Sequence, residues 1–148
     1  GERGDAWSLK AEILTSKADY KKALIAYNRA VKYQRDNASE LFKRALLKMQ
    51  MGDFESAQRD ARALMGRKAK HPGSNYVQGL LHYEAGNYDE AIASLTVTEP
   101  AFKQYPLSMF FLASANLKKG NMDLAANQAE RFHNLSTEPG KHRTVGTG

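Results

Sequence analysis

The sequence predicts an all-α fold, a solenoid of about four helix-turn-helix repeats. The first observation is a pair made of a small residue and Asp or Asn, which recurs every 34 residues without insertion or deletion. The pairs are Ala18-Asp19, Gly52-Asp53, Gly86-Asn87 and Gly120-Asn121. A period near 34 residues with two helical stretches per unit is typical of stacked helical hairpins. Such folds work by presenting a surface to another molecule, so we expect binding before catalysis.

The second observation is that large and small residues keep the same interval. A large residue follows each pair: Tyr20, Phe54, Tyr88 and Met122. Small residues recur in the middle of the first helix and early in the second: Ala11, Ala45, Gly79, Ala113 and Ala23, Ala57, Ala91, Ala125. Small side chains let two antiparallel helices approach closely, and the large residue fills the space beside them. One unit cannot bury these faces alone, so the core forms only when neighbouring units stack.

The register sets the expected boundaries. The repeats are 4–37, 38–71, 72–105 and 106–139, in one domain of residues 4–139 that is followed by a flexible tail, 140–148. In the second repeat we expect a first helix from about Ser39 to Met51, with Ser39 as its N-cap. Gly52 suits the left-handed residue that ends this helix, and Asp53 then caps the second helix.

The prolines give further signals. Pro72 and Pro106 are expected to start the first helices of repeats three and four, where a missing N–H costs little. The stretch Thr96–Pro106 is the least helical, and we expect it to loosen the junction between these repeats. Ser136–Gly148 shows no apolar periodicity. It predicts either a frayed tail or a strap that docks on a partner.

Composition and charge limit the classes of function. The chain has 42% hydrophobic and 26% charged residues, as globular proteins do, and no run approaches the ~20 apolar residues of a membrane span. The absence of Cys excludes disulfides and thiolate-bound zinc. Residues 1–71 carry 16 Lys and Arg against 9 Asp and Glu, whereas residues 72–148 carry 6 against 7. The basic half either attracts an anionic partner or simply solvates the outer helices.

The repeat resembles the tetratricopeptide repeat (TPR), whose framework is W-x₂-L-G-x₂-Y, then A-x₃-F, then P. The matching residues of the first repeat are Trp7, Ala11, Leu14, Ala23, Tyr27 and Ala30, and those of the third are Gly79, Tyr88, Ala91 and Leu95. The second and fourth repeats are looser, with Ala61 and Ala129 at the aromatic position, and Arg44 and Gln78 replace the expected Leu. The resemblance covers about 136 of the 148 residues and implies a right-handed α-α superhelix.

A narrower resemblance rests on the third and fourth repeats. The run from His71 to Tyr88, followed by Pro106 and Asn116-x₃-Gly120-Asn121, is similar to the TPR-repeat lipoproteins associated with exopolysaccharide and the PEP-CTERM sorting system. That resemblance implies a fragment of a larger exported protein, a periplasmic lipoprotein, and the start at Gly1 rather than Met agrees with an excised piece. Residue patterns alone leave a cytoplasmic and an extracytoplasmic location both open.

In the family that the chain resembles, the first helix of each repeat lines a concave groove through its fifth, ninth and twelfth positions. These spacings share one helical face. In repeats two to four the apolar residues at these positions are Phe42, Leu46, Met49, Tyr76, Leu80, Tyr83, Phe110 and Leu117. We expect them to bind an amphipathic helix or an extended peptide, with the four aromatic residues at least partly accessible. The alternative is that they form core.

Motifs for catalysis are missing from the sequence. The four His residues lack metal-binding spacing, and no phosphate-binding glycine loop occurs, so neither an enzyme nor a cofactor or metal is expected. Ser8 and Glu12 stand where co-chaperones of this class carry the Lys and Asn of a carboxylate clamp. The leading interpretation is a noncatalytic scaffold for a protein or peptide partner.

The sequence leaves two further binding modes open. The alternative to the scaffold is a nucleic-acid or anionic-polymer (exopolysaccharide) binder that uses the basic N-terminal half. The Lys21-Lys22 and Lys118-Lys119 runs lack interleaved aromatic residues, which disfavours nucleic acid. An uncapped last repeat also predicts self-association, with Phe132 and Leu135 abnormally exposed.

Overall fold

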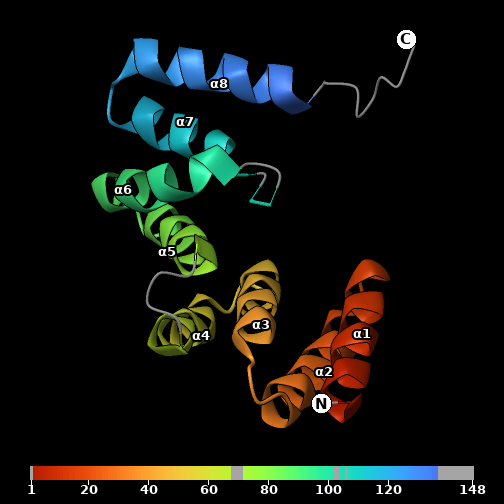
Figure 1. The fold of residues 1–148 in the computed structure, drawn as a ribbon. Coiled ribbons are helices and arrows are strands. Elements are labelled where there is room, and N and C mark those ends of the chain that lie inside the picture. The colour runs from red at the N-terminus through yellow and green to blue at the C-terminus, as the bar shows by residue number, and fades with distance from the viewer. Residues whose placement is uncertain (1, 68–71, 102–103, 106, 137–148) are drawn as a thin grey trace, which may run out of the picture. The chain divides into compact units, whose positions relative to one another are not determined.

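A computed structural model describes residues 2–67, 72–101, 104–105 and 107–136 of the chain (Figure 1). In this part every regular element is helical. The elements are α1 (Glu2–Ser16), α2 (Tyr20–Tyr33), α3 (Ala38–Gln50), α4 (Phe54–Arg67), α5 (Pro72–Glu84), α6 (Tyr88–Thr98), the short 3₁₀ helix η1 (Glu99–Ala101), α7 (Ser108–Lys118) and α8 (Met122–Ser136). The predicted all-α, TPR-like repeat fold is confirmed.

The chain divides into two compact units, Gly1–Gln78 and Gly79–Gly148. The boundary falls inside α5, between Gln78 and Gly79. The division into four repeats over residues 4–139 stays a prediction.

Within each unit, helices that are neighbours in the sequence pack together. In the first unit α1 packs on α2, α3 on α2 and α4 on α3; in the second α7 packs on α6 and on α8. Ala11, Ala23, Ala57 and Ala91, four of the predicted small residues, are fully buried. A Cβ atom on Gly79 would lie 2.6 Å from the side chain of Leu95, so α5 and α6 also approach closely. These contacts agree with the helix-approach role predicted for the small positions.

The four predicted turns share one backbone geometry. Gly52, Gly86 and Gly120 have φ values of 84°, 82° and 84°, in the left-handed region, and Ala18 follows with φ 60°. The residue after each of them bonds back five residues; for example, Asp53 N–H donates to the Lys48 carbonyl at 2.8 Å. This is the Schellman pattern, which satisfies carbonyl groups at a helix C-terminus. The first turn reaches it without a glycine, so Ala18 carries backbone strain that the other three turns avoid.

One of the two predicted helix caps is wrong. Asp53 caps α4 as expected, since its Oδ1 accepts a hydrogen bond from Ser56 N–H at 3.1 Å. Ser39, in contrast, lies inside the first turn of α3, because the helix begins one residue earlier, directly after Asn37. The Asn37 side chain donates to the Val31 carbonyl at 3.0 Å, so it joins α3 to the end of α2.

The stretch around Thr96–Pro106 is only partly irregular. Pro72 starts α5 as predicted, whereas Pro106 lies outside the described residues. Helix α6 continues to Thr98, and η1 follows it. The hydroxyl groups of Thr98 and Ser108 lie 2.8 Å apart, both buried, and Tyr105 is buried as well. Thr98 and Tyr105 are thus anchored in the core, whereas Thr96, Val97, Pro100 and Gln104 are exposed. A looser junction between the repeats stays a prediction. The tail after 136 lies outside the described residues.

Candidate functional site

The eight predicted groove residues differ in their exposure. Phe42, Leu46, Met49, Leu80 and Tyr83 are half-buried, and Phe110 and Leu117 are exposed. Tyr76 is only 4% exposed, so its expected accessibility is wrong. Its ring lies 6.3 Å from the ring of Phe42, which places it in the packing between α3 and α5. The binding role of these residues stays a prediction.

Aromatic packing in the second unit accounts for the half-burial of Tyr83. Its ring lies 5.0 Å from Phe111 and 5.6 Å from Tyr88, both in edge-on arrangements. Phe110 in turn lies 5.1 Å from Phe111 and 5.9 Å from Phe132. Edge-to-face pairs of this kind stabilise by about 0.5–1.5 kcal/mol each beyond their buried area. Tyr83 therefore serves the core, and Phe110 keeps one side open to solvent.

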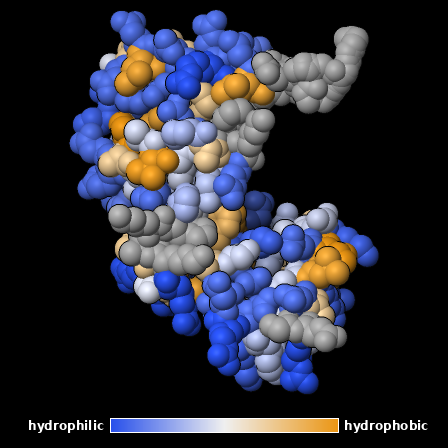
Figure 2. Space-filling view, in the orientation of Figure 1, coloured by the Kyte–Doolittle hydropathy of each residue, from blue (hydrophilic) through white to orange (hydrophobic). Residues whose placement is uncertain are grey.

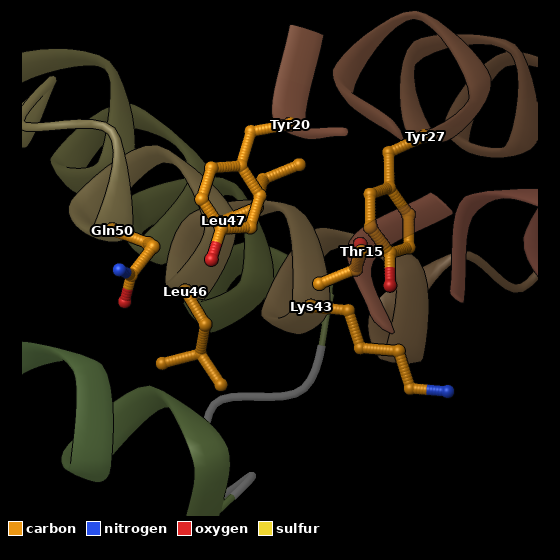
Figure 3. Close-up of a pocket in the computed structure, with 7 residues that line it drawn as sticks. All are labelled: Thr15, Tyr20, Tyr27, Lys43, Leu46, Leu47 and Gln50. Atoms are coloured by element: carbon orange, nitrogen blue, oxygen red, sulfur yellow. The ribbon is translucent and has the colours of Figure 1, made fainter. Parts of the chain in front are cut away.

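A pocket in the first unit collects predicted and unpredicted residues. It has a volume of about 290 Å³ and is lined by Thr15, Tyr20, Tyr27, Lys43, Leu46, Leu47 and Gln50. The two tyrosines project from α2 toward α3 (Figure 3). Leu46 is the predicted groove residue that this pocket contains. Its volume lies at the lower end of the ~300–1,000 Å³ of ligand sites, which suits a side chain of a partner better than a free small molecule.

The polar groups of this pocket are held in place. Burial is the main cause that raises the pKa of Tyr27; a hydrogen bond with the Thr15 side chain lowers it, and the charges of Glu12 and Glu40 raise it. Tyr27 therefore stays a neutral phenol at neutral pH. The Lys43 ammonium lies 3.2 Å from Glu12 at the edge of the pocket. The pocket thus has an apolar floor and a partly neutralised rim.

The sequence interpretation missed the two tyrosines as site residues. Both were assigned to the repeat framework, because Tyr20 follows the first turn and Tyr27 takes the framework aromatic position. Tyr27 is the only aromatic residue at that position among the four repeats, where Ala61, Leu95 and Ala129 stand in the others. That difference between equivalent positions was the signal that could have found the pocket.

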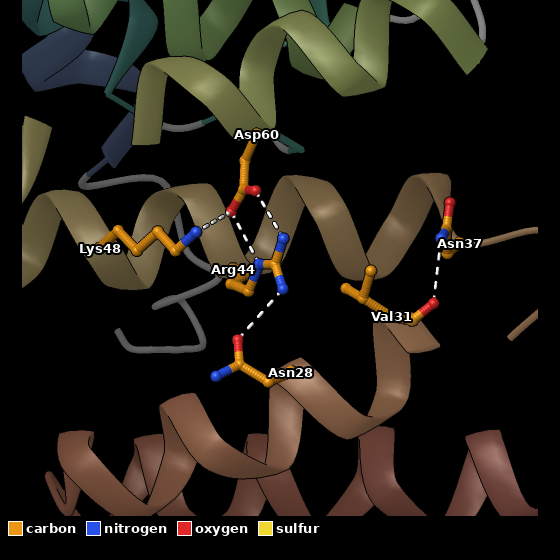
Figure 4. Close-up of polar contacts among 6 residues, drawn as sticks. All are labelled: Asn28, Val31, Asn37, Arg44, Lys48 and Asp60. Carbon is orange, nitrogen blue, oxygen red and sulfur yellow. Dashed lines mark hydrogen bonds and ion pairs between the residues drawn. The ribbon is translucent and has the colours of Figure 1, made fainter. Parts of the chain in front are cut away.

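A buried ionic cluster joins three helices of the first unit (Figure 4). Asp60 on α4 accepts two hydrogen bonds from Arg44 on α3, at 2.6 and 2.8 Å, and Lys48 Nζ lies 2.8 Å from its Oδ2. Arg44 also donates to Asn28 Oδ1 on α2 at 3.1 Å. Each charge in the cluster is paired, and Arg44 binds both carboxylate oxygens of Asp60. The cluster therefore fixes the mutual position of these helices. Its role is structural, since Asp60 is almost fully buried.

Cations surround Trp7 at the surface of the α1–α2 hairpin. The Arg29 guanidinium lies 4.7 Å from the indole ring centre, and the Lys10 ammonium lies 5.1 Å from it. Together with Lys22 and Ile25 they line a shallow hollow of about 390 Å³. Binding of single-stranded nucleic acid uses aromatic rings together with cations. This hollow has both, whereas the lysine runs in the sequence have no aromatic residue between them. This hollow is therefore the place where the basic half could meet an anion.

The described part of the chain contains neither a cluster of metal-ligating side chains nor a helix suited to span a membrane. No three His, Cys, Asp or Glu side chains in residues 2–67, 72–101, 104–105 and 107–136 gather closely enough to hold a metal ion. No described helix is both long enough and apolar enough to cross a membrane. His82 is half-buried on α5, and His71 and His142 lie outside the described residues.

The stacked hairpins, the left-handed turns and the small residues between helices define a TPR-type repeat protein. Residues 16–98, more than half of the chain, match the family described as anaphase-promoting complex, cyclosome, subunit 3, a TPR-type repeat family. The chain belongs to this family. A comparison with the curated proteins found no match. The resemblance to exopolysaccharide-associated lipoproteins is not addressed by the family match and stays a prediction.

Proposed function

We propose that this protein is a noncatalytic scaffold and that a segment of a partner protein binds in the pocket between α1, α2 and α3. TPR-type repeat families generally mediate contacts between proteins, which supports a scaffold role. The observation that carries the proposal is the open apolar space between Leu46 and the tyrosines Tyr20 and Tyr27. Leu46, in the lining of this pocket, is one of the residues that the repeat pattern predicts for partner binding.

The chemistry of the pocket favours a segment with one apolar anchor side chain. Leu46 and Leu47 supply apolar surface, and burial of an apolar anchor against them is favourable by about 25 cal/mol per Å². The tyrosine hydroxyl groups and Gln50 add donors and acceptors for the backbone of an extended peptide or for a helix end. Lys43, half-buried at the rim, favours an acidic residue next to the anchor.

A peptide selection tests this proposal. Random peptides displayed on phage are selected on the whole 148-residue chain, and the affinity of the winners is measured by calorimetry. Gln50→Arg, which fills the mouth of the pocket from an exposed position, should weaken binding by about tenfold or more, which is ~1.4 kcal/mol. Leu46→Glu should do the same.

Leu124→Glu is the control, because it makes the same change of side chain at an exposed leucine that lies on α8 and outside the pocket. It should leave affinity unchanged, and circular dichroism should confirm that all three variants fold. Selected peptides that bind Gln50→Arg and Leu46→Glu as tightly as the unchanged chain would overturn the assignment of the pocket.

The second candidate function is binding of an anionic polymer at the hollow around Trp7. Its specific support is the pair of cations over the indole ring. Heparin and a single-stranded RNA homopolymer are suitable probes. Electrostatic binding should weaken steeply as salt rises, and Arg29→Ala should lower it further. Peptide binding in the apolar pocket should change little with salt, so one titration series separates the two functions.

A further inference from the structure

An apolar groove is open on the last hairpin. We call it the terminal groove; it is lined by Phe110, Ala113, Leu117, Met122, Ala125 and Ala129 of α7 and α8, and its volume is about 500 Å³. Leu117 is 53% exposed and Met122 61% exposed. Figure 2 shows apolar surface over this hairpin. An open hollow with so little polar lining predicts an occupant.

The equivalent place on the first hairpin is filled by the next helix. Ala11, Ala23 and Tyr27, which stand 102 residues before Ala113, Ala125 and Ala129, are buried together with Leu47 of α3. The second unit repeats this arrangement. Tyr83, 34 residues before Leu117, contacts Phe111 of α7 with 5.0 Å between ring centres. The terminal groove therefore has the form of a seat for the first helix of one more repeat.

Helix α1 has the matching face exposed. Leu9 and Ile13 are equivalent to Lys43 and Leu47 of α3 and to Phe111 and Ala115 of α7. In α3 and α7 this face lies against the preceding hairpin, and Leu47 and Ala115 are buried. In α1 the same face is open, with Leu9 61% and Ile13 48% exposed. We call Leu9, Ile13 and the flanking Lys10 and Lys17 the insertion face.

We propose that the insertion face of one copy of this chain docks in the terminal groove of a second copy, head to tail. The contact continues the stacking that the repeats already make within each unit. Leu9 of one copy would meet Leu117 of the next, as Phe111 meets Tyr83 within the chain. Leu9 stands where α5 has Val77 and α7 has Phe111, and Phe110 stands where α3 has Phe42 and α5 has Tyr76. Both proposed surfaces therefore carry the apolar residue type that most of the repeats have at these positions.

Charge complementarity supports a second copy as the occupant. Lys119 on α7 forms an ion pair with Asp89 on α6 at 3.1 Å, and the equivalent residues across the proposed contact are Lys17 and Asp123. Asp123 lies at the edge of the terminal groove.

A second polar contact between neighbouring hairpins also predicts opposite charges across the proposed contact between copies. Arg44 on α3 donates to Asn28 on α2 at 3.1 Å. The equivalent residues across the proposed contact are Lys10 and Glu130, again of opposite charge. Exposed ion pairs add little to affinity, so these pairs set the register while the apolar faces supply the affinity.

The contact joins two different surfaces, so it does not close on itself in a dimer. Each docked pair keeps one insertion face and one terminal groove for further copies. The expected products are therefore oligomers larger than dimers, whose size increases with concentration. This association is independent of the pocket between α1, α2 and α3, because neither docking surface includes Leu46 or Tyr27.

Sedimentation velocity over a range of concentrations tests the proposal with the whole 148-residue chain. Leu9→Glu should block the insertion face, and Met122→Glu should block the terminal groove; both residues are exposed, so the fold should tolerate the changes. Each variant alone should be a monomer. An equal mixture should form a dimer that does not grow, because one intact face meets one intact groove. Val97→Glu, at an exposed position on α6, is the matched control and should associate like the unchanged chain.

Charge reversal tests the register. Lys17→Asp and Asp123→Lys should each lower the association constant several-fold, and the double variant should restore it, since the pair is rebuilt with its charges exchanged. A chain that stays monomeric at all concentrations overturns the proposal. So does association that persists in Leu9→Glu, which would indicate a contact that does not use the insertion face, such as a symmetric contact through α8.

Discussion

The two units solve the same packing problem with different chemistry. In the first unit, Lys48 on α3 and Asp60 on α4 form a buried ion pair at 2.8 Å. In the second unit, the residues 68 positions later, Asn116 on α7 and Gln128 on α8, form a neutral hydrogen bond at 2.9 Å. The 34-residue register thus decides which two positions meet, while the residues at those positions need only match each other. The buried charge of Asp60 is paired with cations, and the buried amide of Asn116 is hydrogen-bonded, so neither group is left unsatisfied.

The largest loss of stability should come from removing the buried ion pair of the first unit. Asp60→Ala leaves the Arg44 and Lys48 cations without their buried carboxylate, and we expect the free energy of unfolding to fall by about 3–5 kcal/mol. Urea denaturation followed by circular dichroism measures it. Asp89→Ala, which removes an exposed carboxylate paired with Lys119, should cost no more than about 1 kcal/mol. Equal losses for the two variants would show that burial of the cluster does not matter.

Enlarging the small residues between helices should affect both units alike. Ala57 and Ala91 are fully buried at equivalent positions of the second and third repeats. Replacing either by Leu should destabilise by about 1–3 kcal/mol through overpacking. Thermal unfolding of the two variants and of the unchanged chain measures the change in melting temperature. An unchanged melting temperature for both variants would mean that these positions do not set the approach of the helices.

Removing the neutral hydrogen bond of the second unit should lower the free energy of unfolding by less than removing the ion pair of the first unit. Asn116 donates to Gln128, and its Oδ1 accepts from Asn121 at 3.0 Å. Asn116→Ala leaves one buried amide oxygen without this donor but no buried charge, so we expect a loss of about 1–2 kcal/mol in the same urea assay. A loss as large as that of Asp60→Ala would contradict the contrast between the units.

The smallest effect concerns alkaline pH. Burial raises the pKa of Tyr27, with the Thr15 hydrogen bond opposing it, and burial raises the pKa of Tyr105 in the second unit. Because the folded pKa lies above the unfolded value of about 10, each phenol's contribution is complete below pH 10 and is lost as pH rises further. The melting temperature should fall less steeply between pH 9 and about 11 in Tyr27→Phe than in the unchanged chain. Parallel slopes would exclude a contribution from Tyr27.

The period predicted most of the fold, because it reports contacts that every repeat shares. The turns at Gly52, Gly86 and Gly120, the cap at Asp53 and the buried alanines follow from it. Ser39 was misplaced because capping depends on a one-residue choice of where a helix begins. Side-chain exposure was harder to predict.

Tyr76 shows why exposure escaped the sequence pattern. Its position in the repeat is that of Phe110, yet Tyr76 is buried and Phe110 is open, because exposure depends on the neighbours that each helix happens to have. The pairing of Lys48 with Asp60 was readable from the register, as was that of Asn116 with Gln128. A comparison of equivalent positions in the four repeats would have predicted both pairs. A comparison of each repeat with the TPR consensus did not.

The packing of each helix on its neighbour in the sequence also has a kinetic consequence. Contacts such as those of α1 with α2 or α7 with α8 close short loops, and chains dominated by local contacts fold in microseconds to milliseconds. Each hairpin can form as soon as its two helices have left the ribosome, before the rest of the chain exists. We therefore expect the molecule to unfold hairpin by hairpin rather than in a single step. Amide hydrogen exchange would show this as a different protection level for each hairpin.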